Sequence, residues 1–351
     1  MEATIENVRI AGLSAALPLQ EQRIEESDYG SPEMLARFKA ATSIQRRRLC
    51  APDQFCSDLA VAAASRLLDD LGWNREEIGA LVFVTQSPDV ALPATACMMQ
   101  ERLGLGTGCA AFDVNLGCSG YPYGLYIAGS MVRKNGCRRV LLLVGDSSGK
   151  SNNNPALEPQ PPLFGDAATA TALEWSEDSP PMHFSLHTNG AGWDKIMERK
   201  PGGRPGLQPE VFRYVNGQEG SVHVNTQYQL KGEDVFNFSV RTAPAAVEDM
   251  LKRVAWSKEE VDFFVFHQAN RMINDAILKR LKLDPAKAPS TLPAFGNTSS
   301  ATIPLTLVDQ VGARLRQGRQ KLILCGFGVG LSWGTVACEP GPISCLELVE
   351  I

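Results

Sequence analysis

Cys118 is the residue of this chain whose setting points most clearly to chemistry. It lies in the segment Asn-Leu-Gly-Cys-Ser-Gly-Tyr-Pro, between a predicted strand at residues 110–114 and a predicted helix that runs to Asn135. Pro122 suits a first helical turn, so Cys118 is expected at or just before the helix N-terminus. The positive end of the helix dipole lowers the pKa of a thiol in that position. The pattern predicts a nucleophile, and a buried structural cysteine is the alternative.

Two polar residues are candidate partners for this thiol. His267 ends an apolar predicted strand at residues 263–267, and the ends of strands are where active-site groups gather in α/β folds. Asn297 lies in Gly-Asn-Thr-Ser-Ser, a segment that is also typical of a helix N-cap. Structural or surface roles are expected for the remaining histidines, which lie in less regular segments: His183, His187 and His223.

Elements that would position these residues follow from the alternation of β-rich runs and helical patterns, which predicts an α/β protein. Strands are expected at residues 8–12, 80–85, 110–114, 140–144, 168–173, 263–267 and 322–325. The glycine-rich run at 326–330 follows the last of them, and it is expected to bring backbone N–H groups close to a substrate oxygen. Two stretches rich in Pro, Gly and Asn, residues 149–162 and 197–220, are expected to be loops or lids.

Markers in the first half of the chain recur in the second half at an offset of 182 or 183 residues. The matching pairs are Trp73 with Trp256, Pro122 with Pro304, and Gly136 with Gly318. The same offset makes Ser300 the counterpart of Cys118. A repeat of this length indicates duplication of a whole half-domain. We therefore expect an N-terminal half at residues 1–175 that carries the nucleophile, and a C-terminal half at 176–351 that carries His267 and Asn297.

The composition excludes several classes of function. With 34 Lys and Arg residues against 39 Asp and Glu, the net charge is −5, so nothing indicates a nucleic-acid partner. No apolar run is long enough for a membrane span, and the polar N-terminal segment lacks the features of a secretory signal. The nine cysteines show no zinc-binding spacing, so no metal is expected, and they are interpreted as reduced thiols of a cytoplasmic protein.

Five blocks of sequence carry a resemblance that extends over almost the whole chain. They are LFGD at 163–166, KGEDVF at 231–236, HQAN at 267–270, GNTS at 296–299 and GFGVGLSWG at 326–334. In this order and spacing they resemble the β-ketoacyl-acyl-carrier-protein synthase III family of thiolase-fold condensing enzymes. The resemblance implies a five-layer αβαβα sandwich of two pseudo-repeated halves, in agreement with the repeat.

The resemblance also implies a role for each matched residue. Cys118 would accept an acyl group from a thioester, and condense it with a malonyl-type or β-ketoacyl carrier-bound nucleophile. His267 and Asn297 would donate hydrogen bonds to the thioester oxygen of that nucleophile. Backbone N–H groups of Cys118 and Val329 would form a second oxyanion hole. No cofactor is implied, and the residues expected to bind substrate are Leu92, Phe164, Phe236 and Asn270.

Two departures from the family pattern concern the acyl donor. Relatives that use acyl-coenzyme A commonly carry a tryptophan where this chain has Met34, and an arginine before the Phe-Gly-Asp block, whereas residues 151–162 contain no Arg or Lys. The donor is therefore expected to be an acyl carrier protein or an unusual acyl-coenzyme A ester, and the pattern resembles secondary-metabolism relatives.

Partner proteins are expected at two surfaces. A helix at 270–282 is predicted to place a basic face near the active-site mouth, where an acidic carrier protein would dock, although a merely solvated charged face is the alternative. The basic residues of that face are Arg271, Lys279 and Lys282. The resemblance further implies a homodimer that pairs through the strand at 110–114, with Leu92 near the partner's acyl tunnel.

Three other functions fit part of the pattern. The same residues could transfer an acyl group to a hydroxyl or amine without decarboxylation, with His267 as general base. A non-catalytic partner subunit of a synthase is the second alternative, and the joint presence of Cys118, His267 and Asn297 argues against it. An unrelated cysteine hydrolase is the third, because Cys–His pairs recur there.

Overall fold

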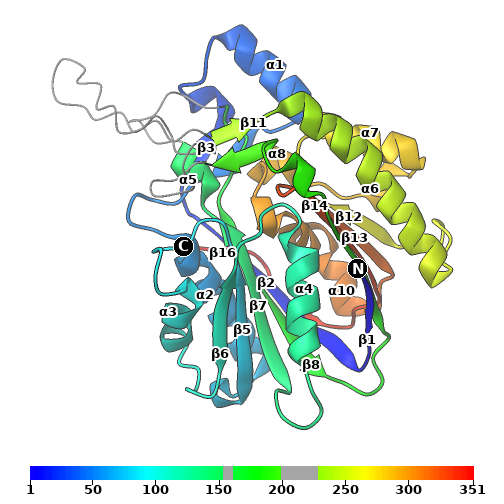
Figure 1. Ribbon diagram of the computed structural model, residues 1–351. Coiled ribbons are helices and arrows are strands. Elements are labelled where there is room, and N and C mark those ends of the chain that lie inside the picture. The colour runs from blue at the N-terminus through cyan, green and yellow to red at the C-terminus, as the bar shows by residue number, and fades with distance from the viewer. Residues whose placement is uncertain (153–160, 199–227) are drawn as a thin grey trace.

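The computed structural model describes residues 1–152, 161–198 and 228–351, and its elements form alternating layers of helix and sheet (Figure 1). One sheet has the order β15-β2-β8-β7-β5-β6, with β16 also paired to β2. Its strands are β2 (Val8–Leu17), β5 (Ile78–Val84), β6 (Ala110–Val114), β7 (Arg139–Asp146), β8 (Ala167–Trp175), β15 (Ser344–Cys345) and β16 (Val349–Glu350).

The second sheet has the order β1-β9-β14-β13-β12. Its strands are β1 (Glu2–Ile5), β9 (Met182–Thr188), β12 (Phe263–Phe266), β13 (Leu322–Gly328) and β14 (Ser332–Cys338). Two short antiparallel pairs lie outside both sheets: β3 (Glu21–Arg23) with β4 (Arg46–Arg48), and β10 (Ile196–Glu198) with β11 (Tyr228–Leu230).

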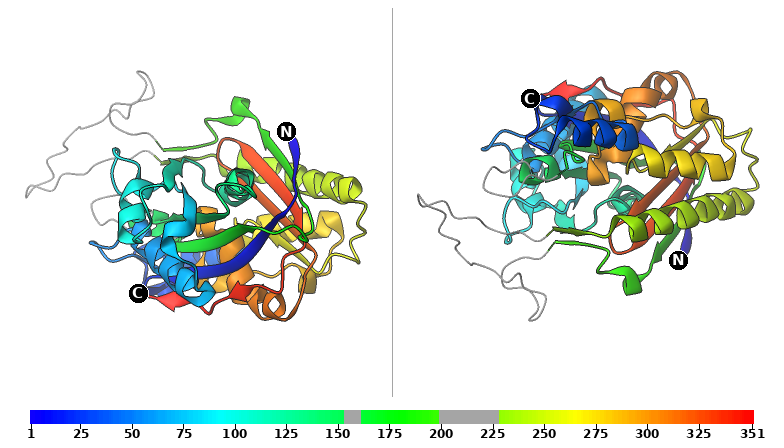
Figure 2. Two further views of the ribbon diagram at one scale, coloured as in Figure 1. Left: turned by 90° about the horizontal axis from the view of Figure 1, so that it is seen from below. Right: turned by 90° about the horizontal axis from the view of Figure 1, so that it is seen from above.

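Helices occupy the middle and both outer faces, which gives the five layers of the thiolase fold (Figures 1 and 2). The central layer holds α4 (Gly120–Met131), α9 (Thr302–Thr306) and α10 (Gly312–Gln317). The first sheet is covered outside by α2 (Cys56–Leu71) and α3 (Thr95–Arg102), and the second by α6 (Gly232–Val254) and α7 (Arg271–Leu281). Three further α-helices complete the set in the described residues: α1 (Pro32–Thr42), α5 (Ser148–Asn152) and α8 (Leu292–Phe295).

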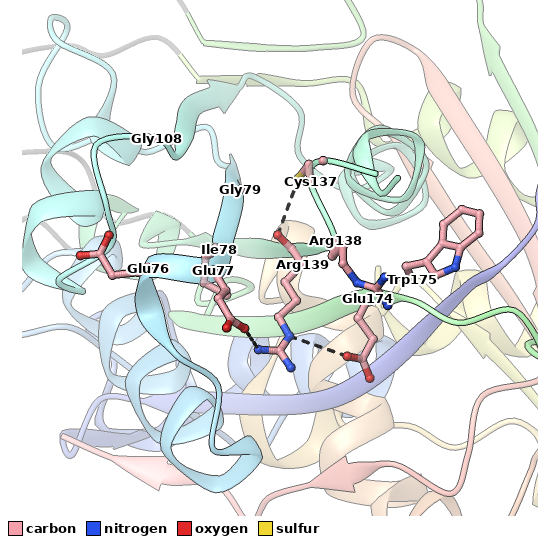
Figure 3. Close-up of a pocket in the computed structure, with 11 residues that line it drawn as sticks. Glu76, Glu77, Ile78, Gly79, Gly108, Cys137, Arg138, Arg139, Glu174 and Trp175 are labelled. Atoms are coloured by element: carbon pink, nitrogen blue, oxygen red, sulfur yellow. Dashed lines mark hydrogen bonds and ion pairs between the residues drawn. The ribbon is translucent and has the colours of Figure 1, made fainter. Parts of the chain in front are cut away.

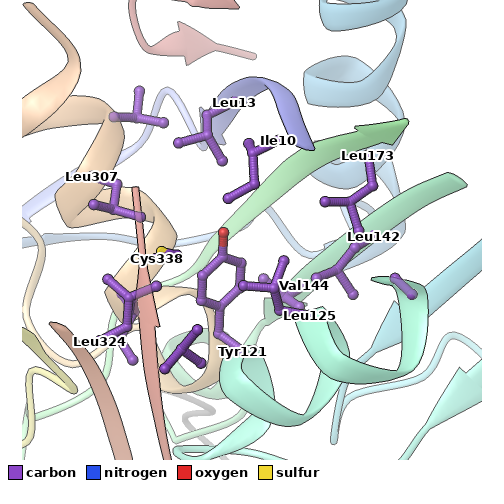
Figure 4. Packing of buried hydrophobic residues seen from close by; sticks show 14 of the residues in the cluster. Ile10, Leu13, Tyr121, Leu125, Leu142, Val144, Leu173, Leu307, Leu324 and Cys338 are labelled. Carbon is purple, nitrogen blue, oxygen red and sulfur yellow. The ribbon is translucent and has the colours of Figure 1, made fainter. Parts of the chain in front are cut away.

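The central layer is apolar on both sides, which explains the almost uniformly apolar sequence of α4. Tyr121 of this helix is fully buried among side chains from both sheets, such as Leu142 of β7 and Leu324 of β13 (Figure 4). Its hydroxyl stays paired, 3.2 Å from the Thr171 hydroxyl. A buried helix between two sheets holds the turn before it in place, so Cys118 starts from a rigid support.

All seven predicted strands are confirmed, and β6 has the predicted bounds. Two expectations are wrong. His183 and His187 do not lie in an irregular segment but on the half-buried face of β9, where polar and buried residues alternate as a strand requires. The helix after Cys118 ends at Met131 and not at Asn135, because Val132 has extended backbone angles. His223 and most of the two expected lids, residues 149–162 and 197–220, lie outside the described residues.

The internal repeat appears as matching strand arrangements. The parallel pair β5–β7 followed by antiparallel β8 corresponds to the parallel pair β12–β13 followed by antiparallel β14. At the offset of 182 residues, Asp146 at the end of β7 corresponds to Gly328 at the end of β13. Strands from the two chain ends cross over: β1 lies in the second sheet, and β15 and β16 in the first. The division at residues 175 and 176 falls between β8 and β9 and stays a prediction.

Two further properties of the described residues bear on function. None of their helices is long and apolar enough to cross a membrane. All nine cysteines are within these residues and none forms a disulfide; five are buried, and Cys97 is the exposed one.

Candidate active site

Cys118 lies in the turn between β6 and α4, two residues before the helix begins. A hydrogen bond of 2.6 Å from the Gly120 N–H to the Gly117 carbonyl closes this turn. The Cys118 side chain keeps partial solvent access although its neighbours Gly117 and Ser119 are buried. The expected placement just before the helix N-terminus is therefore confirmed, and the thiol is both enclosed and reachable.

The end of β13 packs directly against this turn because two of its residues have no side chain. A Cβ added at Gly326 would lie 3.0 Å from the Cys118 carbonyl oxygen, and one at Gly328 would lie 2.6 Å from the Cys118 Cβ. Gly328 also has φ +155, which side chains rarely tolerate. The Ser119 hydroxyl lies 2.6 Å from the Ser332 hydroxyl, so the contact is fixed from both strands of the β13–β14 hairpin.

His267 is positioned by the strand before it. Its backbone N–H donates to the Cys325 carbonyl at 2.8 Å, which extends the parallel pairing of β12 with β13 by one residue. The side chain is 2% exposed. Its Nδ1 lies 2.8 Å from the Thr302 hydroxyl, and its ring meets the Phe327 ring edge-on with centroids 5.6 Å apart. The imidazole is thus held in one orientation.

Asn297 is held by backbone pairing and by its own side chain. Its N–H donates to the Leu163 carbonyl at 3.0 Å, and its carbonyl accepts from the Gly165 N–H at 3.1 Å. The side-chain Oδ1 accepts from the Ser299 N–H at 2.9 Å. Because the oxygen is occupied in this way, the amide NH₂ is the end that can donate. One of its two N–H groups donates to the Ala269 carbonyl at 3.4 Å, which leaves the other for a substrate.

The three predicted residues converge on the end of β13. Cys118 packs on Gly326, and His267 is bonded to the preceding residue of the same strand. Thr302, in the turn that begins at Asn297, touches the His267 ring. Two elements from the second half of the chain and one from the first therefore supply the side chains of a single site.

Asp146, at the end of β7, is a residue of this region that sequence reasoning missed. Its carboxylate is fully buried and accepts hydrogen bonds from the Gln86 N–H at 2.6 Å and from Ser300 through both N–H (3.3 Å) and hydroxyl (2.8 Å). The hydroxyls of Thr85 and Ser87 lie 3.2 and 3.4 Å away. The only local feature of the sequence that could have pointed to Asp146 was an acidic residue at the end of a strand, because its hydrogen-bond partners are distant in sequence.

The electrostatic setting differs from the expectation that the helix dipole lowers the pKa of Cys118. Burial raises the pKa of this thiol to about 11, and the Asp146 carboxylate acts in the same direction, while N–H groups of Val329 and Cys118 oppose it. Burial lowers the pKa of His267 to about 3, opposed by the carbonyl of Ser299. Loss of hydration is the largest effect on both groups, so both are neutral at physiological pH.

The remaining predicted residues have the following surroundings. The Val329 N–H faces the Cys118 sulfur, where an oxyanion donor would be needed. Phe164 forms an isolated bridge with Asn297, and Phe236 packs at the edge of the core between α6 and the second sheet. Leu92 is 87% exposed in the segment between β5 and α3. Their substrate contacts stay predictions, as does that of Asn270, whose side chain caps α7 by accepting from Ile273 N–H at 2.9 Å.

The basic face of α7 is only partly where it was expected. Arg271, Lys279 and Lys282 are exposed, and the opposite face is buried as predicted. Arg271 follows the site directly, but Lys279 lies eight residues further along, or about 12 Å at the rise of a helix. Arg271 also pairs with Asp275 at 3.1 Å. Only the first of the three residues therefore lies beside the site.

A separate pocket opens at the opposite end of the first sheet (Figure 3). Its lining includes Cys137 and the ends of β5, β7 and β8 that face away from Cys118. The charge of Arg139 is engaged by Glu77 and Glu174 within the pocket, and its guanidinium stacks 4.7 Å from the Trp73 ring. This pocket is not part of the site around Cys118.

Comparisons with known proteins agree with this geometry. The family model of 3-oxoacyl-(acyl-carrier-protein) synthase III matches residues 112–190, and the model of its C-terminal part matches residues 251–339. The β-ketoacyl-(acyl-carrier-protein) synthase III of Xanthomonas euvesicatoria pv. vesicatoria is 33% identical over 340 residues, which cover 93% of this chain and 96% of that protein. That of Bacillus pumilus is 31% identical over 348 residues, covering 95% and 99%.

A crystal structure of a 3-oxoacyl-(acyl-carrier protein) synthase from Burkholderia xenovorans superposes with a TM-score of 0.90 at 31% identity, covering 100% of this chain and 99% of that one. Fold and matches define an acyltransferase of the thiolase-fold condensing-enzyme class. The chain belongs to the β-ketoacyl-(acyl-carrier-protein) synthase III family.

The raised pKa of Cys118 predicts how the thiol reacts with alkylating agents. Only the thiolate reacts, and its fraction below the pKa of about 11 rises roughly tenfold for each pH unit. The rate of Cys118 alkylation by iodoacetamide, followed by peptide mass spectrometry, should therefore climb without a plateau from about pH 7 to about pH 10. The Cys118→Ala variant corrects for the other eight thiols. A plateau near neutral pH would instead reveal a stable thiolate.

Proposed function

We propose that Cys118 accepts an acyl group from a thioester and that the enzyme condenses it with a malonyl-type or β-ketoacyl carrier-bound nucleophile. His267 and Asn297 donate hydrogen bonds to the thioester oxygen of a malonyl-type nucleophile as it loses carbon dioxide and the electron pair of the broken C–C bond forms the enolate. The backbone N–H groups of Cys118 and Val329 stabilise the oxyanion formed on the acyl group itself. The carbanion then attacks the acyl carbonyl, and the Cys118 thiolate departs.

One observation supports this division of roles above the others. The Cys118 thiol, the side-chain donors and the backbone N–H donors all lie near the end of β13. The orientation of the Asn297 amide leaves its NH₂ as a donor. The neutral ring of His267, with its pKa lowered by burial to about 3, is a weak base near neutral pH. A hydrogen-bond donor suits it better than a general base, which favours condensation over acyl transfer to a hydroxyl or amine.

Substitution of the three side chains should separate loading from condensation. Cys118→Ala should abolish covalent acyl loading, seen as added mass in intact-protein mass spectrometry with acyl-coenzyme A and acyl-carrier-protein donors. His267→Ala and Asn297→Ala should still load but condense at least about 10²-fold more slowly, the usual effect of losing one oxyanion donor. Loading that persists on Cys118→Ala, or normal condensation by both other variants, would reject the proposed roles.

A carrier protein as acyl donor, extender donor or both is the second part of the proposal. The segment that begins α1 presents Met34, 45% exposed, where coenzyme A users commonly stack adenine on tryptophan. Arg271 lies at the start of α7, directly after the His267 block, and α1 packs against α7. A positive charge at this edge would steer an acidic carrier toward the thiol.

Charge reversal tests the docking surface. Arg271→Glu combined with Lys279→Glu should raise the apparent KM for a carrier-bound substrate about tenfold or more, and leave turnover of an acyl-N-acetylcysteamine thioester unchanged. Arg314→Glu with Arg319→Glu is the matched control, because these exposed arginines precede β13 at the end remote from Cys118. Equal effects of the two pairs, or of one pair on both substrates, would contradict docking at α7.

A homodimer paired through β6 completes the proposal. β6 is an edge strand of the first sheet, and its five residues are half-buried or exposed. Edge strands with free backbone groups favour pairing with a second chain. Light scattering should give twice the mass of the chain at micromolar concentration, and a monomer would exclude this pairing. The nine unpaired thiols support a reducing compartment such as the cytoplasm, which cell fractionation can check.

A further inference from the structure

The donor role of His267, which the proposed function requires, depends on which ring nitrogen carries the proton. A neutral imidazole has one N–H, and its other nitrogen can only accept. For His267 to donate from Nε2 toward a substrate, Nδ1 must be bare and must accept a hydrogen bond. The groups around Nδ1 therefore decide whether the ring is a donor or an acceptor in the site.

Two groups of the turn at residues 299–302 lie on the Nδ1 side of the ring: the Thr302 hydroxyl, which contacts Nδ1, and the Ser299 carbonyl, 2.9 Å from that hydroxyl. They have opposite preferences. The Ser299 carbonyl favours a proton on the ring, as its effect on the pKa of His267 shows. A carbonyl only accepts, so it stabilises N–H at Nδ1 and removes it from Nε2. The Thr302 hydroxyl, 2.8 Å from Nδ1, can either accept or donate. Of these two groups, only Thr302 can support a proton on Nε2.

The Thr302 hydroxyl has a second partner, the Ser299 carbonyl at 2.9 Å. If it donates there, the ring must donate from Nδ1, and Nε2 is left bare. If it turns to Nδ1, the Ser299 carbonyl still keeps a donor, because the Thr302 backbone N–H also bonds to it. Turning the hydroxyl therefore leaves no buried carbonyl unpaired, which makes the Nε2–H form accessible at low energetic cost.

We infer that Thr302 is a positioning residue that acts through His267, its hydroxyl donating to Nδ1 so that Nε2 keeps its proton and donates a hydrogen bond to the enolate oxygen. Its surroundings suit this role. Thr302 is 1% exposed, so water does not compete for the ring nitrogen. Ser299 has a left-handed backbone with φ 52, and Asn297 Oδ1 accepts from its N–H. The turn that carries Asn297 therefore also sets which nitrogen of His267 carries the proton.

Substitution of Thr302 should separate the two half-reactions. Thr302→Val removes the hydroxyl and leaves the Ser299 carbonyl as the acceptor on the Nδ1 side of the ring, which favours a proton on Nδ1. Acyl loading of Cys118 should proceed at the wild-type rate, and condensation should fall by about 10²-fold, the loss typical of one donor. Thr302→Ser keeps the hydroxyl and should behave like the wild type. Normal loading also reports that the variant is folded.

Thr306→Val is the matched control. The Thr306 hydroxyl is also fully buried one helical turn away, where it donates to the Thr302 carbonyl at 2.8 Å and lies 3.0 Å from the Thr291 hydroxyl. This substitution removes the same group from the same helix without touching the ring. If Thr306→Val slows condensation as much as Thr302→Val, the effect is one of packing, and the inference is overturned.

The tautomer can be read directly by ¹⁵N NMR on protein with labelled histidine, with the His267→Gln variant identifying the signals of His267. The wild type should show the proton on Nε2, and Thr302→Val should move it to Nδ1. A wild-type ring protonated on Nδ1, or the same tautomer in both proteins, would overturn the inference. Normal condensation by His267→Ala would instead reject the proposed function, so the two failures are distinguishable.

Discussion

The buried carboxylate of Asp146 is the interaction on which the arrangement of the site depends. Its hydrogen bonds join the end of the first sheet to Ser300, and so connect the two halves of the chain at one point. Without this acceptor, the buried N–H group of Ser300 would lose its partner, at a cost of about 1–3 kcal/mol. Because Asn297 and Thr302 belong to the same turn as Ser300, the carboxylate also helps to fix the two residues to which we assign hydrogen bonding toward the substrate.

The internal repeat allows the Asp146–Ser300 interaction to be compared with the equivalent positions in the other half. Ser300 is the counterpart of Cys118, and Gly328 is the counterpart of Asp146. In the first half, the end of β7 carries Asp146, which binds the hydroxyl of Ser300 in a turn of the second half. In the other half, the strand end has no side chain, and the thiol occupies the space that a side chain would need. At one of the two equivalent positions, Asp146 and Ser300 form a structural hydrogen bond. At the other, the absence of a side chain at Gly328 leaves room for the Cys118 thiol.

Much of the fold could be predicted because its signals are local. Apolar runs and the helix start at Pro122 identified strands and the position of Cys118, and the repeat agreed with the two sheets. The role of Asp146 could not be predicted, since its partners are 60 and 154 residues away. The pKa of Cys118 was expected to be low, but the dipole was the only effect that sequence reveals. Burial depends on the whole fold, and here it is the larger effect.

The neutral state of Cys118 also has a consequence for the durability of the enzyme. Peroxide oxidises thiolates far faster than thiols, and oxidation beyond sulfenic acid is irreversible in most proteins. A nucleophile whose pKa is about 11 spends almost all of its time protonated, so oxidants meet an inert group. In the proposed mechanism, reactivity arises when a thioester occupies the site and the backbone N–H groups of Cys118 and Val329 stabilise the charge that forms. The same burial that makes the thiol a poor general nucleophile protects it between turnovers.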